Sequence, residues 1–375
     1  MSRHRSYPGG PFPERLCLFR LSAIGDCCNI VPVVRTLQAF LPDTRLTWVM
    51  GKTEASLLGD LDGVEVIPHD KRNGTGTLRH QLGARDFDVL LLMQVALRAG
   101  LTARAVRAPV RIGFDRSRSR DGHGLFVNRR IPARPPGHVT EGFFGFCEAL
   151  GVKERVLRWD IPVPETSVEQ VDHWLGTASR RGGKESPPLL VISPCSSERF
   201  RNFRDWPAEH YARVAHHAAV KHGMQVVFTG GKSEREREYG ERIEYELARL
   251  GKVPVPKLNL IGRTSLKALF ALIRRATAVI APDSGPVHMA VAAGTPALGL
   301  YATSNPDRTG PLLGRRWVVN AYPQAVQRFL KRSVDGIPWG KRVRDPNAMA
   351  LITPAMVIER LDALMETPPE ERLDE

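Results

Sequence analysis

Residues 278–296 read Ala278-Val-Ile-Ala-Pro-Asp-Ser-Gly-Pro-Val-His-Met-Ala-Val-Ala-Ala-Gly-Thr-Pro296, and this stretch decides the fold class. Its apolar beginning predicts a buried strand that stops at Asp283, and Ser284-Gly285 then opens a helix of small residues that carries His288. Such a helix start presents backbone N–H groups and a positive helix end, which together suit a diphosphate. The alternative interpretation is an ordinary strand-to-helix turn in which Asp283 caps the helix.

The same alternation of apolar strands and helices continues on both sides of this stretch. The second half predicts strands at residues 189–193, 225–229, 279–281 and 297–301, and the first half at 16–21, 46–50, 64–67, 89–93 and 110–113. We therefore expect an α/β fold of two doubly wound Rossmann-like domains that face each other across a cleft. The expected division is a first domain at 1–165, a linker region at 166–188, a second domain at 189–350, and a C-terminal helix and tail at 351–375.

Two further segments of the second half follow predicted strands and carry groups that suit a nucleotide. Ser196 and Ser197 offer paired hydroxyls and Arg204 offers a guanidinium, which fits a diphosphate. A polar loop anchored by Trp206 is the alternative. Glu234 begins the next helix and is a candidate for ribose hydroxyls, against a plain surface helix. The Gly-Lys-Ser before it is not a triphosphate loop, because the glycine that such a loop requires is replaced by Val226.

In the first half, Leu21-Ser-Ala-Ile-Gly-Asp26 forms the turn between the first predicted strand and its helix. Gly25 permits a tight backbone there, and Asp26 projects from the helix start. A carboxylate in this place can take a proton from an attacking hydroxyl. Plain capping of the helix is the alternative role of Asp26.

The net charge of +14 is uneven and indicates an anionic partner. Ten arginines against two aspartates give the segment from Arg98 to Arg134 a charge of +8. Phe114 and Phe126 are its only aromatic residues, so stacked nucleic-acid bases are not expected. An acidic acceptor or the anionic inner face of a membrane fits better. A solvated basic surface without a partner is the alternative.

Cysteine and histidine spacing predicts no metal, and nothing in the sequence indicates a cofactor. The five cysteines are an odd number without a Cys-x-x-Cys pair, which argues against both a disulfide framework and a zinc site. His216, His217 and His222 lack a convincing ligand spacing. No signal-peptide pattern or membrane-spanning apolar stretch occurs, so we expect a cytoplasmic protein.

Taken together, the motifs resemble glycosyltransferase family 9, the lipopolysaccharide heptosyltransferases. The resemblance runs nearly end to end, and its most specific parts are Leu21-Ser-x-x-Gly-Asp26 and Asp283-Ser-Gly-x-x-His288. Supporting matches are Leu46-Thr-Trp-Val, Phe87-Asp-Val-Leu, Arg111-Ile-Gly-Phe, His138-Val-Thr-Glu141, Asp205-Trp-Pro and Gly230-Gly-x-x-Glu234. The family implies a GT-B fold and a metal-independent, inverting transfer of heptose from ADP-heptose to an acidic inner-core sugar of lipopolysaccharide.

The resemblance also implies roles for single residues. Asp26 would be the general base, and the first domain would bind the acceptor, for which Arg98, Arg104 and Arg120 are the candidates. The second domain would bind the nucleotide sugar through Ser196, Ser197, Arg204, Glu234, Asp283, Ser284, Gly285 and His288.

The family commonly has a lysine where this chain has Arg204, so Arg199 or Arg201 is an alternative cation. The other functions to test are those of another GT-B enzyme, such as a transferase of a different nucleotide sugar or a sugar-nucleotide epimerase, and non-catalytic binding of an anionic polymer or membrane surface.

Overall fold

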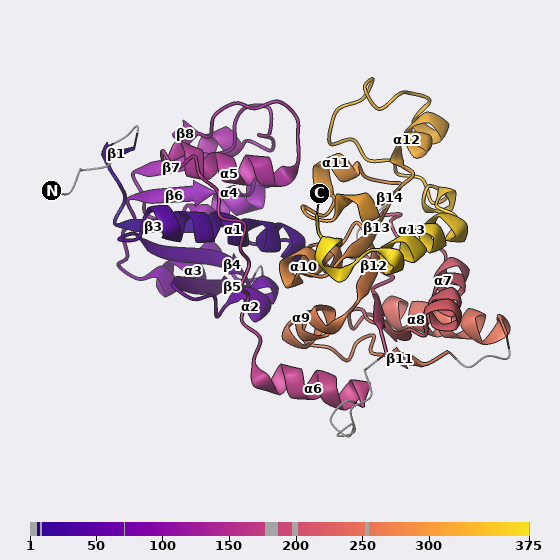
Figure 1. The fold of residues 1–375 in the computed structure, drawn as a ribbon. Coiled ribbons are helices and arrows are strands. Elements are labelled where there is room, and N and C mark those ends of the chain that lie inside the picture. Colours follow the sequence, from indigo (N-terminus) through magenta and orange to yellow (C-terminus); the bar gives the residue numbers. More distant parts are fainter. Residues whose placement is uncertain are drawn as a thin grey trace. The chain divides into compact units, whose positions relative to one another are not determined.

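The computed structural model describes residues 6–7, 10–70, 72–176, 187–196, 202–251 and 255–374. The chain divides into two compact units, Met1–Pro162 and Val163–Glu375, and each is described by itself below (Figure 1). Part of the range expected as a linker, 166–188, is helical: α6 covers Glu165–Leu175 and belongs to the second unit.

The first unit is built on a six-stranded sheet of order β5-β4-β3-β6-β7-β8, in which every neighbouring pair is parallel. A small antiparallel hairpin, β1–β2, precedes the sheet. The strands are β1 (Ser6–Tyr7), β2 (Gly10–Pro11), β3 (Arg15–Phe19), β4 (Arg45–Gly51), β5 (Val64–His69), β6 (Val89–Leu92), β7 (Val110–Gly113) and β8 (Arg129–Arg130). The helices are α1 (Ile24–Phe40), α2 (Lys52–Leu58), α3 (Thr75–Leu82), α4 (Leu97–Ala103), the 3₁₀ turn η1 (His123–Phe126) and α5 (Val139–Ala149).

Both faces of this sheet are buried. Leu16, Cys17, Leu18 and Phe19 of the central strand β3 are all fully buried, although their side chains alternate between the two faces. Helix α1 packs with α5, and α3 packs with α4, so separate groups of helices cover the sheet. A continuous apolar run, rather than an alternating one, is the pattern that such a doubly covered parallel strand requires.

The second unit repeats this plan with the order β11-β10-β9-β12-β13-β14, again parallel throughout. Its strands are β9 (Leu189–Ile192), β10 (Gln225–Phe228), β11 (Lys257–Asn259), β12 (Ala278–Pro282), β13 (Ala297–Tyr301) and β14 (Val319–Asn320). Its α-helices are α6, α7 (Ala208–His222), α8 (Glu234–Arg249), α9 (Leu266–Arg275), α10 (Gly285–Ala293), α11 (Pro306–Thr309), α12 (Tyr322–Ala325) and α13 (Pro354–Glu366). Short helical turns of other kinds are η2 (Arg315–Trp317), η3 (Val326–Leu330), η4 (Met349–Leu351) and η5 (Pro369–Glu371).

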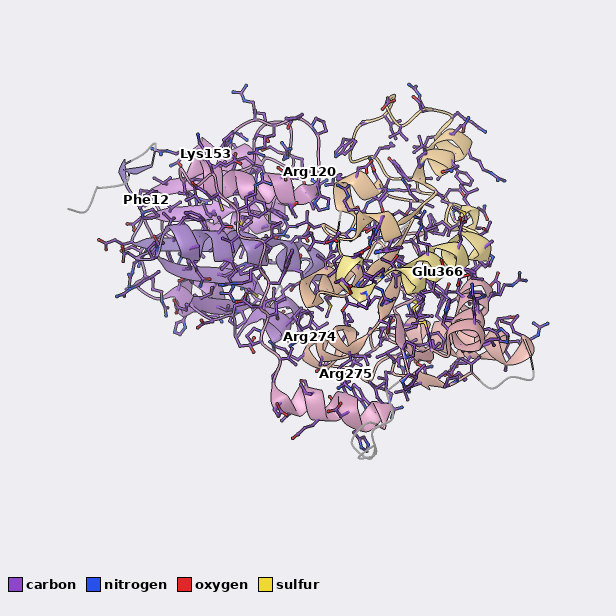
Figure 2. All side chains as sticks on the ribbon, viewed as in Figure 1. Phe12, Arg120, Lys153, Arg274, Arg275 and Glu366 are labelled. Atoms are coloured by element: carbon purple, nitrogen blue, oxygen red, sulfur yellow. The ribbon has the colours of Figure 1, made fainter. Side chains whose placement is uncertain are left out.

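Two groups of helices also pack on the second sheet. Helix α7 lies between α8 and α13, and Trp206 and Tyr211 are fully buried in the core beneath them. In a second group, α9 packs with α10 and with α6. Arg275 at the end of α9 pairs with Asp172 of α6 at 2.6 Å, and Figure 2 labels this arginine beside that helix.

The strand order of each sheet fixes where a ligand can bind. When the strands are numbered along each unit, both sheets read 3-2-1-4-5-6, the order of a dinucleotide-binding fold. In the first unit, the chain continues from β3 toward one edge of the sheet and from β6 toward the other edge. In the second unit, it does the same from β9 and β12. Ligands of such sheets bind outside the carboxyl ends of the strands at this switch point.

The described part of the chain contains no helix that is both long enough and apolar enough to cross a membrane.

Candidate active site

Asp26 lies at the switch point of the first sheet. It occupies the first turn of α1, directly after the loop that follows β3, and its side chain is 32% exposed. The N-cap of α1 is Ala23, which provides no side-chain cap, so Asp26 does not fill that role. A partly exposed carboxylate at a strand's carboxyl end is placed to meet a ligand.

Arg20 holds the Asp26 carboxylate in place and also ties the two sides of the switch point together. Its guanidinium forms an ion pair with Asp26, and its other N–H groups donate to the backbone carbonyls of Ser22, at 2.7 Å, and of Met93, which follows β6. The Arg20 guanidinium also lies over the ring of Phe143, 5.3 Å from its centroid. Because the Arg20 guanidinium binds three oxygen atoms, it holds the Asp26 carboxylate in one orientation.

Gln94 makes a second link across the same switch point. Its side-chain oxygen accepts a hydrogen bond from the backbone N–H of Leu21 at 2.8 Å. The sequence prediction includes neither this residue nor the role of Arg20. Arg20 stands beside the Leu21–Asp26 motif, but its contact with Met93 spans 73 positions, and no local pattern reveals it.

The thiols next to Asp26 are not alternative bases or nucleophiles. Cys27 and Cys28 are fully buried, and burial raises the pKa of the Cys28 thiol to about 12 and that of Cys27 well above its usual value. Protonated, buried thiols do not attack substrates at neutral pH. Asp26 is therefore the group in this turn that can accept a proton.

At the second switch point, the predicted turn after β12 has formed. Ser284 is the N-cap of α10 and Gly285 its first residue, but the Ser284 hydroxyl donates to the Pro282 carbonyl at 3.0 Å and does not cap the helix. The helix start is thus left without a side-chain cap, as an anion-binding helix end would be. His288 lies buried within α10.

Asp283 is buried and bound on two sides. Its carboxylate accepts a hydrogen bond from Ser304 at 2.7 Å and forms an ion pair with Arg204 at 3.3 Å. Arg204 also donates to the Asp283 backbone carbonyl and, through Nε, to the side-chain oxygen of Asn202 at 2.6 Å. Arg204 therefore links the segment after β9 to the turn after β12, and it holds Asp283 rather than pointing into solvent.

Ser196 is engaged within the protein as well. Its hydroxyl and its backbone N–H both donate to the Asp205 carboxylate, at 2.9 and 2.8 Å, and Asp205 forms an ion pair with Arg235 of α8. The sequence prediction does not include Asp205 as a site residue, although it directly precedes the Trp206-Pro207 motif. The predicted site residue Ser197 and the alternative cations Arg199 and Arg201 lie outside the described residues.

Glu234 is the most exposed of the predicted donor residues that the structure describes. It starts α8 with a side chain that is 69% exposed, and it forms an ion pair with Arg237 one turn later. The local capping is done by its neighbours, because Ser233 accepts from the backbone N–H of Glu236 and donates to the Glu236 carboxylate at 2.8 Å. Glu234 is left available at the carboxyl end of β10.

The basic segment is not one uniform surface. Arg111 donates to the carbonyls of Ala103, Val106 and Phe126, so it joins α4 to η1, and burial lowers its pKa. Other arginines are held by hydrogen bonds or ion pairs: Arg107, Arg118, Arg130 and Arg134. Within the described ranges, the guanidinium groups of the three predicted acceptor arginines form no hydrogen bond or ion pair, and all three residues are exposed: Arg98, Arg104 and Arg120.

A basic pocket of about 470 Å³ lies at the carboxyl ends of β7 and β8. Arg116, Arg130 and Arg134 line it, together with Asp115 and Ser117. The pocket belongs to the same edge of the first sheet as Asp26, since the segments that form it follow the last two strands. Three guanidinium groups and one carboxylate therefore line this pocket.

The family model described as Glycosyltransferase family 9 (heptosyltransferase) matches residues 75–334. The chain belongs to glycosyltransferase family 9. It is 37% identical over 355 residues to the lipopolysaccharide core heptosyltransferase OpsX of Haemophilus influenzae, which covers 94% of this chain and 97% of that protein. It is also 26% identical to lipopolysaccharide heptosyltransferase 2 of Escherichia coli, across 92% of this chain and 96% of that one.

Solved structures give the same fold for this family 9 member. A glycosyltransferase family 9 protein from Veillonella parvula has a TM-score of 0.75 at 20% identity, covering 94% of this chain and 98% of its own. Escherichia coli heptosyltransferase WaaC with ADP has a TM-score of 0.67 at 19% identity, with the same coverage. The predicted family and the predicted α/β GT-B fold of two Rossmann-like domains are both confirmed.

Proposed function

We propose that this enzyme transfers heptose from ADP-heptose to an acidic inner-core sugar of lipopolysaccharide, with inversion and without a metal ion. The observation that carries the proposal is the Asp26 carboxylate, which is partly exposed at the first switch point and held there by Arg20. The relative that is 37% identical over nearly the whole chain is a lipopolysaccharide core heptosyltransferase, which supports this substrate class.

In the proposed reaction, Asp26 takes the proton of an acceptor hydroxyl as its oxygen attacks the anomeric carbon of the donor. The bond from that carbon to the diphosphate breaks with its electron pair, and ADP leaves. One displacement inverts the anomeric centre. Arg20 acts as a positioning residue, because it binds the carboxylate and the backbone of both neighbouring loops.

The second unit would bind the donor at its own switch point. The uncapped start of α10, with Ser284 and Gly285, would receive the diphosphate and stabilise the charge that develops on it. Asp283, fixed by Arg204 and Ser304, would accept hydrogen bonds from sugar hydroxyls. Glu234 would bind the ribose. No metal is required, because the helix end and these donors would offset the leaving-group charge.

The acceptor would be held by the basic edge of the first unit. The pocket lined by Arg116, Arg130 and Arg134 suits a carboxylate or phosphate of the growing core. The exposed Arg98, Arg104 and Arg120 add positive charge to the same unit, which would raise the local concentration of an acidic acceptor.

We further propose that the outer surface of α4 and η1 rests on the anionic inner face of the cytoplasmic membrane. Leu97 and Leu101 are one helical turn apart on α4 and are 50% and 46% exposed, and Leu125 of η1 is 84% exposed. The two elements are in contact, because Gly100 lies directly against the ring of Phe126. Exposed leucines among arginines are typical of an interfacial surface.

Vesicle sedimentation tests this surface. Replacement of Leu97, Leu101 and Leu125 by glutamine should reduce binding to phosphatidylglycerol-containing vesicles. Leu157→Gln, a change at a similarly exposed leucine of the same unit, should not. Equal binding by both variants would refute this surface as the contact.

The Asp26→Asn variant tests the chemistry. We expect kcat to fall by about 10²–10⁴-fold, the usual contribution of a general base, while ADP-heptose affinity measured by calorimetry stays within about twofold. Asp43→Asn, at an exposed turn of the same unit, is the matched control. Near-normal turnover in Asp26→Asn would remove this residue from the mechanism.

Thermal stability against ADP-, UDP-, GDP- and CDP-sugars in EDTA tests the donor, because a ligand that binds only the folded state raises the midpoint. We expect a shift with ADP-heptose and with ADP. A shift confined to another nucleotide sugar would replace the donor. If no nucleotide sugar raises the midpoint or is transferred, the donor assignment is wrong.

A further inference from the structure

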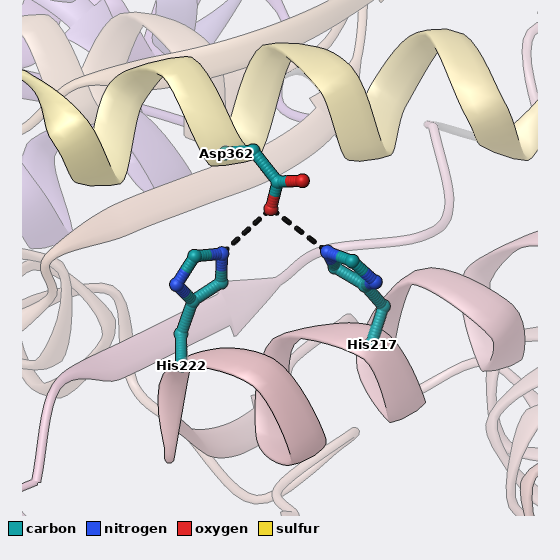
Figure 3. A group of neighbouring side chains, drawn as sticks. All are labelled: His217, His222 and Asp362. Atoms are coloured by element: carbon teal, nitrogen blue, oxygen red, sulfur yellow. Dashed lines mark hydrogen bonds and ion pairs between the residues drawn. The ribbon is translucent and has the colours of Figure 1, made fainter.

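Three side chains of types that bind metals in other proteins meet between helices α7 and α13. His217 and His222 of α7 both point at Asp362 of α13 (Figure 3). Their Nε2 atoms lie 2.8 and 2.6 Å from the same carboxylate oxygen, Oδ1. The three possible ligand atoms all lie within 4.8 Å of one another, and each side chain is partly exposed, so solvent can reach them.

Two imidazole nitrogens and one carboxylate oxygen are a ligand set that suits Zn²⁺ and similar divalent ions. In the structure, both histidines must donate a proton to a single oxygen atom. A cation can replace these two protons and bind all three atoms at once. With ligands about 2.0–2.1 Å from zinc, their mutual separations would be roughly 3.3 Å, which small rotations of the three side chains can reach. Water could complete a tetrahedral site.

The surroundings support the ligands. The second carboxylate oxygen of Asp362, Oδ2, accepts a hydrogen bond from Lys221 at 2.8 Å. This contact orients the carboxylate and leaves Oδ1 for the metal, as the outer partners of metal ligands do. Glu359 and Glu366, on α13 beside Asp362, line the same 630 Å³ pocket as Lys221 and Asp362. Their negative charges offset the positive charge of the lysine and of a bound dication.

We propose that His217, His222 and Asp362 form a structural site for a divalent transition-metal ion, with Zn²⁺ as the best match. The ion would fasten the C-terminal helix α13 to α7, two helices that already pack together. His222 is the last residue of α7, whereas the predicted donor residues Ser196 and Arg204 precede its first residue, Ala208. The 15 residues of α7 extend about 22 Å, so the ion would take no part in the transfer.

The test uses the full chain with any affinity tag removed and with metal stripped by EDTA, which is then dialysed away. Calorimetry with Zn²⁺ alone should give one site per chain, and Co²⁺ should produce the visible absorption of a tetrahedral complex. Zn²⁺ should also raise the unfolding midpoint. The readout is independent of transferase activity, so a wrong donor or acceptor assignment would leave this result unaffected.

The informative variants are His217→Gln and His222→Gln. Glutamine keeps an N–H that can donate to Asp362 but removes the imidazole ligand. If the histidines only donate hydrogen bonds, the variants should therefore behave as the unchanged protein does, whereas metal binding should be lost if they are ligands. We expect each variant to lose at least tenfold in Zn²⁺ affinity and to lose the Co²⁺ spectrum. His173→Gln, on the exposed surface of α6, should bind as the unchanged protein does.

Two results would overturn the proposal. One is the absence of Zn²⁺ and Co²⁺ binding in the folded, unsubstituted protein. The other is unchanged binding in the double variant His217→Gln, His222→Gln, which would place the metal elsewhere in the chain.

Discussion

Replacement of Arg204 by methionine should lower the free energy of unfolding of the second unit by about 3–5 kcal/mol. Arg204 and Asp283 are buried side chains that form an ion pair, and the guanidinium also binds Asn202 and the Asp283 backbone carbonyl. Methionine keeps much of the side-chain volume but leaves the Asp283 carboxylate buried, with the Ser304 hydroxyl as its hydrogen-bond donor. Removal of one partner from a buried ion pair typically costs this much.

The second step is a double-mutant cycle with Asp283→Asn. Asparagine removes the negative charge and can still accept a hydrogen bond from Ser304, so the charge that Arg204→Met would strand is no longer present. We therefore expect the double variant to be more stable than the sum of the single effects predicts, by about 1–3 kcal/mol. Urea unfolding followed by tryptophan fluorescence measures these differences, and Trp206 is a buried reporter in the same unit.

The matched control is Arg237→Met. Arg237 pairs with Glu234 on the exposed surface of α8, where an ion pair contributes about 0–1 kcal/mol. The reasoning is refuted if Arg204→Met costs no more than Arg237→Met, or if the Arg204 and Asp283 effects simply add. A cost without loss of ADP-heptose affinity would further show that the orientation of Asp283 does not matter to the donor.

Three other predictions concern stability. Burial, reinforced by a nearby arginine, lowers the pKa of His123 from 6.5 to about 4, so the unfolded chain takes up this proton first as the pH falls. The stability that this depressed pKa contributes is fully present above pH 6.5. It should be lost as the pH falls from 6.5 to 4, by up to about 3 kcal/mol. His123→Gln should flatten this part of the profile of unfolding free energy against pH, measured by urea unfolding. Gly113→Ala should cost about 1–3 kcal/mol in urea unfolding, because its Cβ would lie 2.4 Å from the His123 ring and 2.7 Å from Val127. Trp206→Phe should cost about 1–3 kcal/mol in the same assay, because it removes the 2.9 Å hydrogen bond to the Ile352 carbonyl.

The central strands and their turns were predictable because their physical signals are local. The strands β9, β12 and β13 are fully buried continuous apolar runs, as parallel strands covered on both faces must be. Helix α10 ends at Gly294, which has the positive φ of 73° that favours glycine. These features place Asp283, Ser284 and Gly285 correctly at the carboxyl end of a strand.

Three of the four edge strands carry weaker signals, and the sequence prediction did not include them. Strands β8 and β14 have two residues each, and β11 has three, so no side-chain period can develop. Helix α9 was also not predicted, although its signals are local. Ser265 caps it, and residues 268–273 form an uninterrupted apolar run that is buried in the structure. A capping serine followed by such a run could have been recognised in the sequence.

The features of the sites that the sequence did not predict are contacts between residues far apart in the chain. Asp283 was identified from its motif, but its pairing with Arg204 spans 79 positions. The histidines of α7 were set aside because their own spacing is not that of a metal site. Asp362, which joins them, lies 140 positions beyond His222. Only the packing of α13 on α7 brings these groups together.

At each switch point, one arginine binds three oxygen atoms, and this explains why an arginine suits each place better than a lysine. Arg20 uses Nε on the Ser22 carbonyl, and its remaining N–H groups on a carbonyl across the switch point and on the Asp26 carboxylate. Arg204 uses Nε on Asn202, and Nη1 on both the carbonyl and the carboxylate of Asp283. A lysine could supply the charge but not a planar fork for three oxygens. Each sheet therefore fixes an aspartate at its ligand-binding edge, the proposed base in one unit and the proposed sugar contact in the other.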